Sequence, residues 1–392
     1  MTILIFFLVL FVLVLVHEWG HFIVAKKTGM RVDEFGIGFP PKLFSIKKGE
    51  TEYTFNLFPI GGFVRIWGED GSNDPSSPVA SEASDRRSEV SAEAGEGGED
   101  VSLKQKVDYS RSFVTKSKWA QAAVLVAGVV MNVVLAWFLF FVIMVMGQPT
   151  AVDEASASPD ARLTIVQVLP DSPAAAAEIP VGAVITDLRA GEDFDQILNY
   201  TSFSAFVSDH TEEDIALTYT LGEEESTVSV RAEAGVIADT PERKAIGVSF
   251  ELIEDVKTPF YTAWYHAGVK TIDSLVLVTV GIFSFFADAF VGQADYSQVA
   301  GPVGIVGMVG DALDFGFTSL LILTAYLSLS LAVINMLPFP ALDGGRLLFV
   351  AIEAVIRRPI SPVWVMRLNA AGFLLLILLM VAVTYNDILR II

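Results

Sequence analysis

Four long apolar stretches constrain the fold of this 392-residue chain more than any other feature. They lie near residues 2–24, 119–146, 319–338 and 369–385, and each is long enough to cross a bilayer as a helix. Since 53% of the residues are hydrophobic and the mean hydropathy is positive, the sequence predicts a polytopic α-helical membrane protein with about four transmembrane helices.

A fifth apolar stretch, residues 272–291, has a different pattern. It contains Asp273 and Asp288, and a glycine-rich turn follows it at 301–304. We interpret it as an interfacial or re-entrant helix, because a spanning helix here would reverse the direction of the next span.

Acidic charge is concentrated in two segments between the apolar stretches. Residues 147–258 hold 22 acidic and 6 basic side chains, and residues 69–100 hold 10 and 2, in a chain with a net charge of -20. Nothing in this distribution indicates nucleic-acid binding. The chain has no cysteine, which excludes disulfides, thiolate metal ligands and a cysteine nucleophile.

Basic residues predict the orientation in the membrane. They follow the first span, precede the second, and lie between the third and fourth, so the positive-inside rule places these loops in the cytoplasm. The acidic region 147–258 and both termini then face outward. We therefore expect a multi-pass protein of the inner or plasma membrane with an extracytoplasmic soluble domain.

The predicted organisation has six parts. Alternating strand patterns at 163–168, 215–221, 227–231 and 246–250 indicate the soluble α+β domain. The β-prone runs 51–58 and 62–67, separated by Pro59-Ile60-Gly61, indicate a membrane-associated β-region. The parts are 1–68, the first transmembrane helix with the β-region; 69–110, an acidic insert predicted to be disordered; 111–150, the second transmembrane helix; 155–255, the soluble domain; 256–318, an interfacial helical linker; and 319–392, the third and fourth transmembrane helices.

A polar motif, His17-Glu18-Trp19-Gly20-His21, interrupts the first apolar stretch. Ionisable groups at membrane depth are costly and are functional candidates by default. Histidines at i and i+4 share a helix face and can bind one zinc ion, and Glu18 on the adjoining face can take a proton from an attacking water. A helix end hydrogen-bonded to its neighbours is the alternative interpretation.

Asp343 is the best candidate for a third metal ligand. It belongs to a second polar motif, Asn335 to Gly345, after the third apolar stretch. We expect the glycines that follow Asp343 to let the backbone bend, so that the carboxylate points back into the helix bundle. The alternative ligands His210 and His266 fall in or near the outward region.

Other polar and turn residues support two interpretations each. Asn335 can bind the substrate backbone or oxyanion, or make an interhelical contact. For Asn132 in the second span we favour packing. Pro338 and Pro340 are expected to break the helix so that its end lines a cavity. The segment 51–67 can hold an unwound peptide substrate, which would pair with its edge as an additional strand. The alternative is an ordinary cytoplasmic hairpin.

The two polar motifs closely resemble the HExxH and NxxPxPxLDG motifs of the site-2 protease family of intramembrane zinc metalloproteases, peptidase family M50, and in particular its bacterial RseP-like members. Residues 35–44, 59–65 and 68–70 resemble the family's re-entrant β-region, and 301–305 another family element. Residues 155–255 resemble a PDZ domain. The resemblance covers nearly the whole chain.

This resemblance implies that His17, His21 and Asp343 bind Zn²⁺ and that Glu18 is the catalytic acid and base. Gly61 and Gly62, in the β-region, are then candidates for contact with substrate. Family members cut single-pass membrane proteins in regulated intramembrane proteolysis, often anti-sigma factors after a first external cut, and some clear remnant signal peptides. The PDZ domain would filter substrates by size or bind a newly exposed C-terminus.

The chain departs from the family pattern at several places. It has room for one PDZ domain, and Gly182-Ala183 stands where Gly-Asp is usual. The second span lacks the common proline before Asn132, and the insert at 70–108 is long and acidic. A catalytically silent scaffold that recruits partners through the PDZ domain is the alternative function, although the intact Glu18 argues against it. A metal transporter is a third interpretation. It would repeat polar residues through several spans, whereas here they cluster at one depth.

Overall fold

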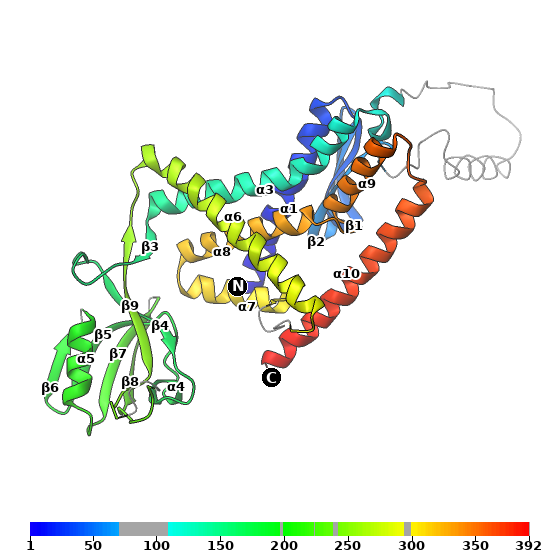
Figure 1. The fold of residues 1–392 in the computed structure, drawn as a ribbon. Coiled ribbons are helices and arrows are strands. Elements are labelled where there is room, and N and C mark those ends of the chain that lie inside the picture. The colour runs from blue at the N-terminus through cyan, green and yellow to red at the C-terminus, as the bar shows by residue number, and fades with distance from the viewer. Residues whose placement is uncertain (70–108, 197–198, 223, 238–241, 294–298, 392) are drawn as a thin grey trace, which may run out of the picture. The chain divides into compact units, whose positions relative to one another are not determined.

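The computed structural model describes residues 1–69, 109–196, 199–222, 224–237, 242–293 and 299–391 (Figure 1). Positions 70–108 of the predicted acidic insert lie outside these residues. The chain divides into two compact units. The first, the membrane unit, comprises residues 1–138, 269–309 and 324–392, and the second comprises 139–268 and 310–323.

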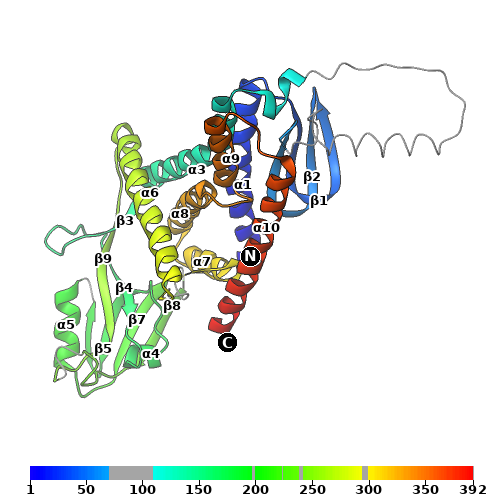
Figure 2. The same cartoon turned by 45° about the vertical axis from the view of Figure 1, so that its right-hand side comes forward.

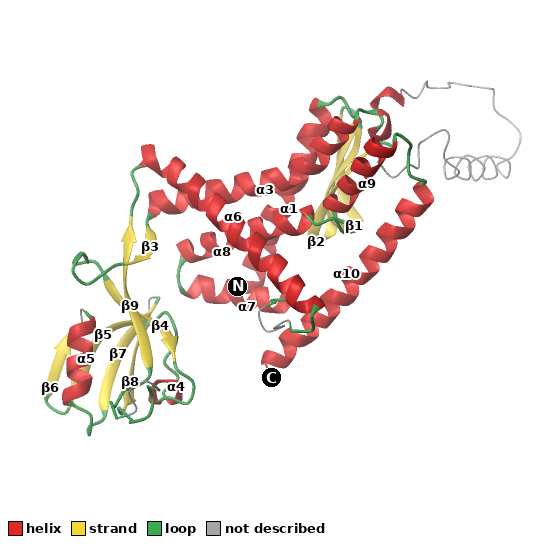
Figure 3. Cartoon of the chain, in the orientation of Figure 1, coloured by secondary structure: helices red, strands yellow, loops and turns green. Residues whose placement is uncertain are grey.

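Five helices in the described part of the chain are long and apolar enough to cross a membrane. They account for all four predicted spans, and α10 extends well beyond its predicted limits of 369–385. The protein is therefore a multi-pass membrane protein with a β-sheet region (Figure 3). The five are α1 (Thr2–Lys27), α3 (Lys118–Met146), α6 (Phe260–Phe290), α8 (Phe317–Met336) and α10 (Pro362–Ile391).

The additional helix is α6, which contains the stretch predicted to be interfacial. In the structure, this stretch is part of a single helix of 31 residues. The length and composition of that helix are sufficient for a membrane span. The estimate of about four spans therefore omitted one eligible helix, and an interfacial position for α6 stays a prediction.

Two long strands, β1 (Val32–Lys48) and β2 (Thr51–Ile66), form the β-region. Gly36 is paired with both Thr54 and Phe63, so the start of β1 lies between two parts of β2. The predicted separation at 59–61 agrees with the pairing, because the partners of residues 34–37 run from 52 to 55 in one part of β2 and from 65 to 62 in the other. Both parts belong to one continuous strand, and Gly61 has a φ of 109° between them. Among its described pairings, segment 62–66 pairs only with the start of β1 and forms a sheet edge.

A buried cluster holds the end of α1 against the β-region and α3. The helix ends at Thr28, whose hydroxyl donates to the carbonyl of Val24, and Gly29 follows with a φ of 71°. The short 3₁₀ helices Tyr109–Arg111 and Phe113–Thr115 then lead into α3. The buried members of this cluster are Ala25, Met30, Val32, Ile66, Phe113, Val124, Leu125 and Val350.

Two further helices belong largely to the membrane unit. α7 (Pro302–Asp314) begins beside Asp387, whose carboxylate accepts from the backbone N–H groups of Gly301 and Gly304. α9 (Asp343–Ile356) lies in a region predicted as a loop between two spans. No helix was predicted within this connection, where α8 ends at Met336 and the new helix starts at Asp343.

The second unit contains an antiparallel sheet with the strand order β3-β9-β4-β5-β7-β8, and β6 pairs with β5 (Figures 1 and 2). The alternating patterns predicted β4 and β7 well, whereas β6 and α5 were not predicted. Buried aliphatic and aromatic side chains fill its core, including Ile165, Leu188 and Leu217. The elements are β3 (Gln148–Ala151), β4 (Arg162–Val168), α4 (Pro173–Ala176), β5 (Val184–Ala190), β6 (Asp193–Gln196), α5 (Tyr200–Asp209), β7 (Ile215–Leu221), β8 (Glu224–Val230) and β9 (Val248–Val256).

Candidate metal centre

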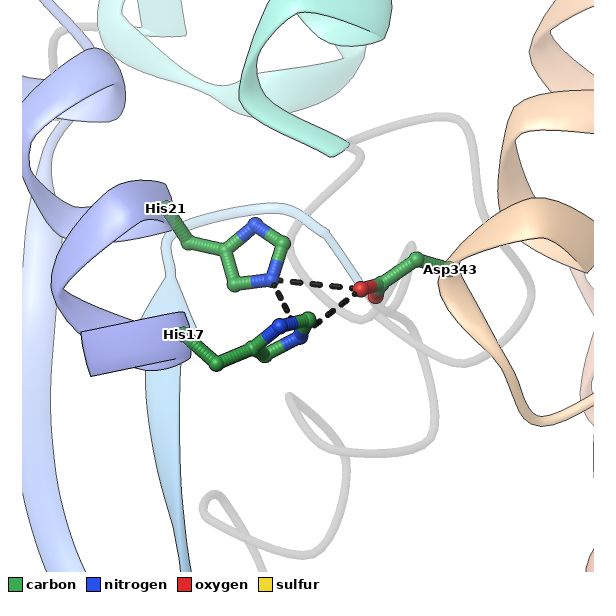
Figure 4. A group of neighbouring side chains, drawn as sticks. All are labelled: His17, His21 and Asp343. Atoms are coloured by element: carbon green, nitrogen blue, oxygen red, sulfur yellow. Dashed lines mark hydrogen bonds and ion pairs between the residues drawn. The ribbon is translucent and has the colours of Figure 1, made fainter. Parts of the chain in front are cut away.

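Three side chains from opposite ends of the chain meet inside the membrane unit (Figure 4). His17 and His21 project from α1, and Asp343 is the first residue of α9. The Nε2 atoms of the two histidines lie 3.1 Å apart. They lie 3.0 Å and 3.3 Å from the same oxygen, Oδ2 of Asp343. Both histidines are buried, so the predicted trio forms one compact group.

Glycines allow α1 and α3 to approach closely at this group. Gly20 of α1 faces the backbone carbonyl of Ala127, and a Cβ there would overlap that carbonyl. Gly128 of α3 lies against both imidazole rings. A Cβ on Gly128 would lie 2.8 Å from the Cε1 atom of His17. Small residues at helix crossings in membranes serve this kind of close approach. Here they make room for two aromatic rings in the helix interface.

Each histidine ring also contacts α3 through its second nitrogen. Nδ1 of His21 lies 2.8 Å from the carbonyl oxygen of Val124. Nδ1 of His17 lies 3.2 Å from the side-chain amide of Asn132. Such contacts orient metal-ligating imidazoles. The interhelical contact favoured for Asn132 agrees with this position, but its partner on α1 was not predicted. The four-residue spacing from Gly128 to Asn132 puts both on one face of α3.

The three ligand atoms fit a zinc ion. Tetrahedral zinc with bonds of about 2.0–2.1 Å separates its ligand atoms by about 3.3 Å, and the observed separations are 3.0, 3.1 and 3.3 Å. Two imidazoles and one carboxylate, with a fourth position left open, are the donor set of a catalytic zinc site. Within the described residues, this is the one cluster of three or more such side chains.

Glu18 lines a pocket beside this group. The other lining residues come from α1 and from both β-strands, and they include Gly61 and Gly62. A Cβ on Gly62 would lie 3.1 Å from the carbonyl oxygen of Gly36 and 3.3 Å from Cγ of Glu18. A side chain at position 62 would therefore narrow the space beside the Glu18 carboxylate.

The loop between α8 and α9 sets the position of Asp343. Ala341 has a φ of 77°, and its N–H donates to Oδ1 of Asn369 at 3.1 Å. Gly344 and Gly345 do not form the predicted turn, because they lie in the first turn of α9. Cβ atoms there would overlap the backbone carbonyls at the end of α8 and in the loop. The glycines are thus required for close approach and not for bending.

The remaining predicted residues lie elsewhere. Asn335 is near the end of α8, and among the described residues its side chain has no hydrogen-bond partner, so a role in substrate binding stays a prediction. His210 is in the second unit, where its Nε2 lies 3.1 Å from Asp193. His266 is on α6. Neither histidine joins the metal-ligand cluster.

Comparison with known proteins agrees with this geometry. The profile of peptidase family M50 matches residues 5–379. The zinc metalloprotease RasP of Oceanobacillus iheyensis is 33% identical over 99% of both chains, and RasP of Bacillus licheniformis is 30% identical over 99% of both chains. The regulator of sigma-W protease RasP of Bacillus subtilis is 28% identical over 99% of this chain and 98% of its own.

The site and the family profile, which matches most of the chain, together define the class of protein. It is a zinc metalloendopeptidase of the site-2 protease type. The chain belongs to peptidase family M50, and its cofactor is Zn²⁺. The predicted family is confirmed, and the silent scaffold is not supported.

Proposed function

We propose that this enzyme hydrolyses peptide bonds within the transmembrane segments of single-pass membrane proteins. His17, His21 and Asp343 hold the zinc ion, and Glu18 is the catalytic acid and base. The observation that carries the proposal is the convergence of three ligand atoms within 3.3 Å of one another. Two of them stand on a helix whose other residues are almost all apolar.

Glu18 moves the protons in this mechanism. Zinc, when bound, polarises the scissile carbonyl and lowers the pKa of an attacking water. The Glu18 carboxylate, which lines the pocket next to the metal ligands, takes a proton from that water and later delivers it to the leaving amine. His17 and His21 stand on the same helix as Glu18, and Asp343 is held against that helix by its contact with His17. The three residues therefore fix the reacting centre relative to Glu18.

The sheet edge at 62–66 holds the substrate. A transmembrane helix satisfies its backbone hydrogen bonds internally, so its scissile bond must be unwound before attack. An extended segment can regain those hydrogen bonds by pairing with a free strand edge. Gly61 and Gly62 bring that edge to the Glu18 pocket without side chains that would block it.

The physiological substrates belong to regulated intramembrane proteolysis. One relative bears the name regulator of sigma-W protease, which supports anti-sigma-factor-like substrates already shortened by a first external cut, or remnant signal peptides. Residues 155–255, within the second unit, act as an extracytoplasmic PDZ-like domain that filters substrates by size or binds a new C-terminus. The active site lies toward the cytoplasmic side, as the distribution of basic residues predicts.

Cleavage of a panel of tagged single-pass substrates by the purified protein in liposomes tests the proposal. Wild type is compared with Glu18→Gln, and the zinc content of both is measured. We expect zinc in both proteins and cleavage inside the substrate span by wild type alone, with a loss of about 10²–10⁴-fold or more in the variant. Well-folded wild type without zinc would refute the ligand assignment, and equal cleavage by both proteins would refute the role of Glu18.

A further inference from the structure

We propose that Asn132 is a positioning residue for His17: its side-chain oxygen accepts the Nδ1–H of the imidazole and so directs Nε2 toward the metal. This inference rests on the proposed ligand set and adds a residue of α3 to it. The geometry that carries it is a wholly buried amide, 3.2 Å from the ring nitrogen, with one atom that has no hydrogen-bond partner within the described part of the chain.

In the structure, the side-chain nitrogen of Asn132 faces His17. Nδ2 lies 3.2 Å from Nδ1 of the ring, while Oδ1 is buried and has no hydrogen-bond partner among the described residues. Oxygen and nitrogen of a side-chain amide have nearly the same size and shape, so their assignment follows from the hydrogen-bond network. Either assignment leaves one amide atom unpaired, so the ring must decide between them.

The ring requires an acceptor. An imidazole that binds a metal through Nε2 carries its hydrogen on Nδ1, and that hydrogen needs an oxygen to receive it. With Nδ2 facing the ring, two donors would meet in a buried site, at the cost of an unmade hydrogen bond. Rotation of the amide by half a turn places Oδ1 at the same position and removes the conflict.

His21 already has the arrangement proposed for His17. Its Nδ1 lies 2.8 Å from the carbonyl oxygen of Val124, and a carbonyl can only accept. Val124, Gly128 and Asn132 are spaced by four residues along α3 and therefore share one face of the helix. That face offers one acceptor to each ring and a glycine between them.

A second contact of Asn132 provides a matched control. Its backbone carbonyl accepts from the hydroxyl of Ser328 on α8 at 2.8 Å, and Ser328 is fully buried. The variant Ser328→Ala removes a buried hydrogen bond at the same residue without affecting the amide or the ring. It separates loss of local packing from loss of the acceptor.

The dissociation constant for zinc, measured on the full-length protein by competition with a chelator, tests the inference without requiring catalysis. Asn132→Asp keeps an acceptor oxygen but has no amide donor, whereas Asn132→Leu has the same bulk and neither group. We expect zinc affinity within a few-fold of wild type for Asn132→Asp and Ser328→Ala. We expect a loss of about 10–100-fold for Asn132→Leu, as for other residues that orient metal ligands.

Three outcomes would overturn the inference. Wild-type affinity in Asn132→Leu would reduce Asn132 to a packing residue. A loss in Asn132→Asp as large as in Asn132→Leu would show that the donor group is needed. Wild type that binds no zinc would refute the ligand set, whereas the first two results leave that set intact.

Imidazole ¹⁵N spectra of the zinc-loaded protein keep the test decisive if Asn132→Leu does not fold. The chain has four histidines, so the rings can be assigned one at a time. We expect a protonated Nδ1 on His17 whose resonance moves in Asn132→Asp, while that of His21 does not. An unprotonated Nδ1 on His17 in wild type would overturn the inference.

Discussion

At the scale of single residues, the sequence predicted that two of the proposed metal ligands lie together because their geometry is local. Residues at i and i+4 always share a helix face, so the pairing of His17 with His21 required no tertiary information. Gly128 and Asn132 were not predicted as part of the site, since their contacts depend on how α1 and α3 cross. That crossing is determined by close packing between helices, which one sequence does not reveal.

Gly128→Ala is expected to remove zinc. The added methyl group would overlap both imidazole rings, and relief requires the rings to move or α1 and α3 to separate at a crossing where Gly20 packs against the Ala127 carbonyl. Zinc content of the purified variant measures the effect, and we expect a loss of at least about 10-fold in affinity. Gly281→Ala on α6 is the control, since nothing in the described structure lies within 4 Å of its added methyl group. Full zinc content in Gly128→Ala would show that the rings can move.

Gly62→Val is expected to impair cleavage and leave zinc binding unchanged. The side chain would enter the pocket between the sheet edge and Glu18, but it would not reach the three ligands through the intervening helix. We expect a fall in kcat/KM of at least about 10-fold for a transmembrane substrate. The variant also tests substrate pairing at this edge, because an unchanged kcat/KM would place the substrate elsewhere.

At the scale of elements, the apolar stretches and alternating strands predicted most helices and several strands. The expected turn at Gly344 and Gly345 is the exception. The prediction treats these glycines as turn residues, but they lie in the first turn of α9, where they allow close approach to the end of α8 and to the loop. Glycines and prolines mark sites where the backbone is unusual or closely approached, and the sequence alone does not distinguish these two cases.

The turn between β1 and β2 is attached to α1 by an ion-pair network around Glu50. The carboxylate accepts from Arg111 at 2.6 Å and 2.8 Å and from Lys26 at 2.6 Å. The Arg111 guanidinium, with help from Lys26, lowers the pKa of Glu50 from 4.5 to about 2. Because the folded-state pKa is depressed, this stabilisation is present above about pH 4.5 and is lost as the pH falls toward 2.

Glu50→Gln is therefore expected to lower the free energy of unfolding at pH 7, by up to about 1 kcal/mol for so exposed a network. The difference from wild type should shrink as the pH falls below 4.5. Unfolding in detergent with increasing denaturant at pH 7 and pH 3 measures it, and high salt at pH 7 should reduce it as well. A difference that is the same at both pH values would mean that Glu50 acts through packing and not through its charge.

At the scale of the whole molecule, composition and charge predicted the division into a membrane unit and an acidic soluble part. The structure places all three proposed metal ligands in the membrane unit, while the sheet of β3 to β9 has a hydrophobic core of its own. The sequence did not predict the close contacts between spans, because different apolar residues can fill the same space between two helices.

Zinc binding should therefore stabilise one unit and leave the other unchanged. A ligand at one hundred times its dissociation constant adds about 2.7 kcal/mol to the unit that binds it. Hydrogen–deuterium exchange with zinc or with a chelator measures this segment by segment. We expect zinc to slow exchange in α1, α3 and α9, which contain or support the ligands, and to leave β4, β5 and β7 unaffected. His17→Ala should abolish the effect and Glu18→Gln should retain it, because only the first removes a ligand. If zinc slowed exchange equally in the sheet, the two units would have to unfold together, and the soluble part would be energetically coupled to the metal centre.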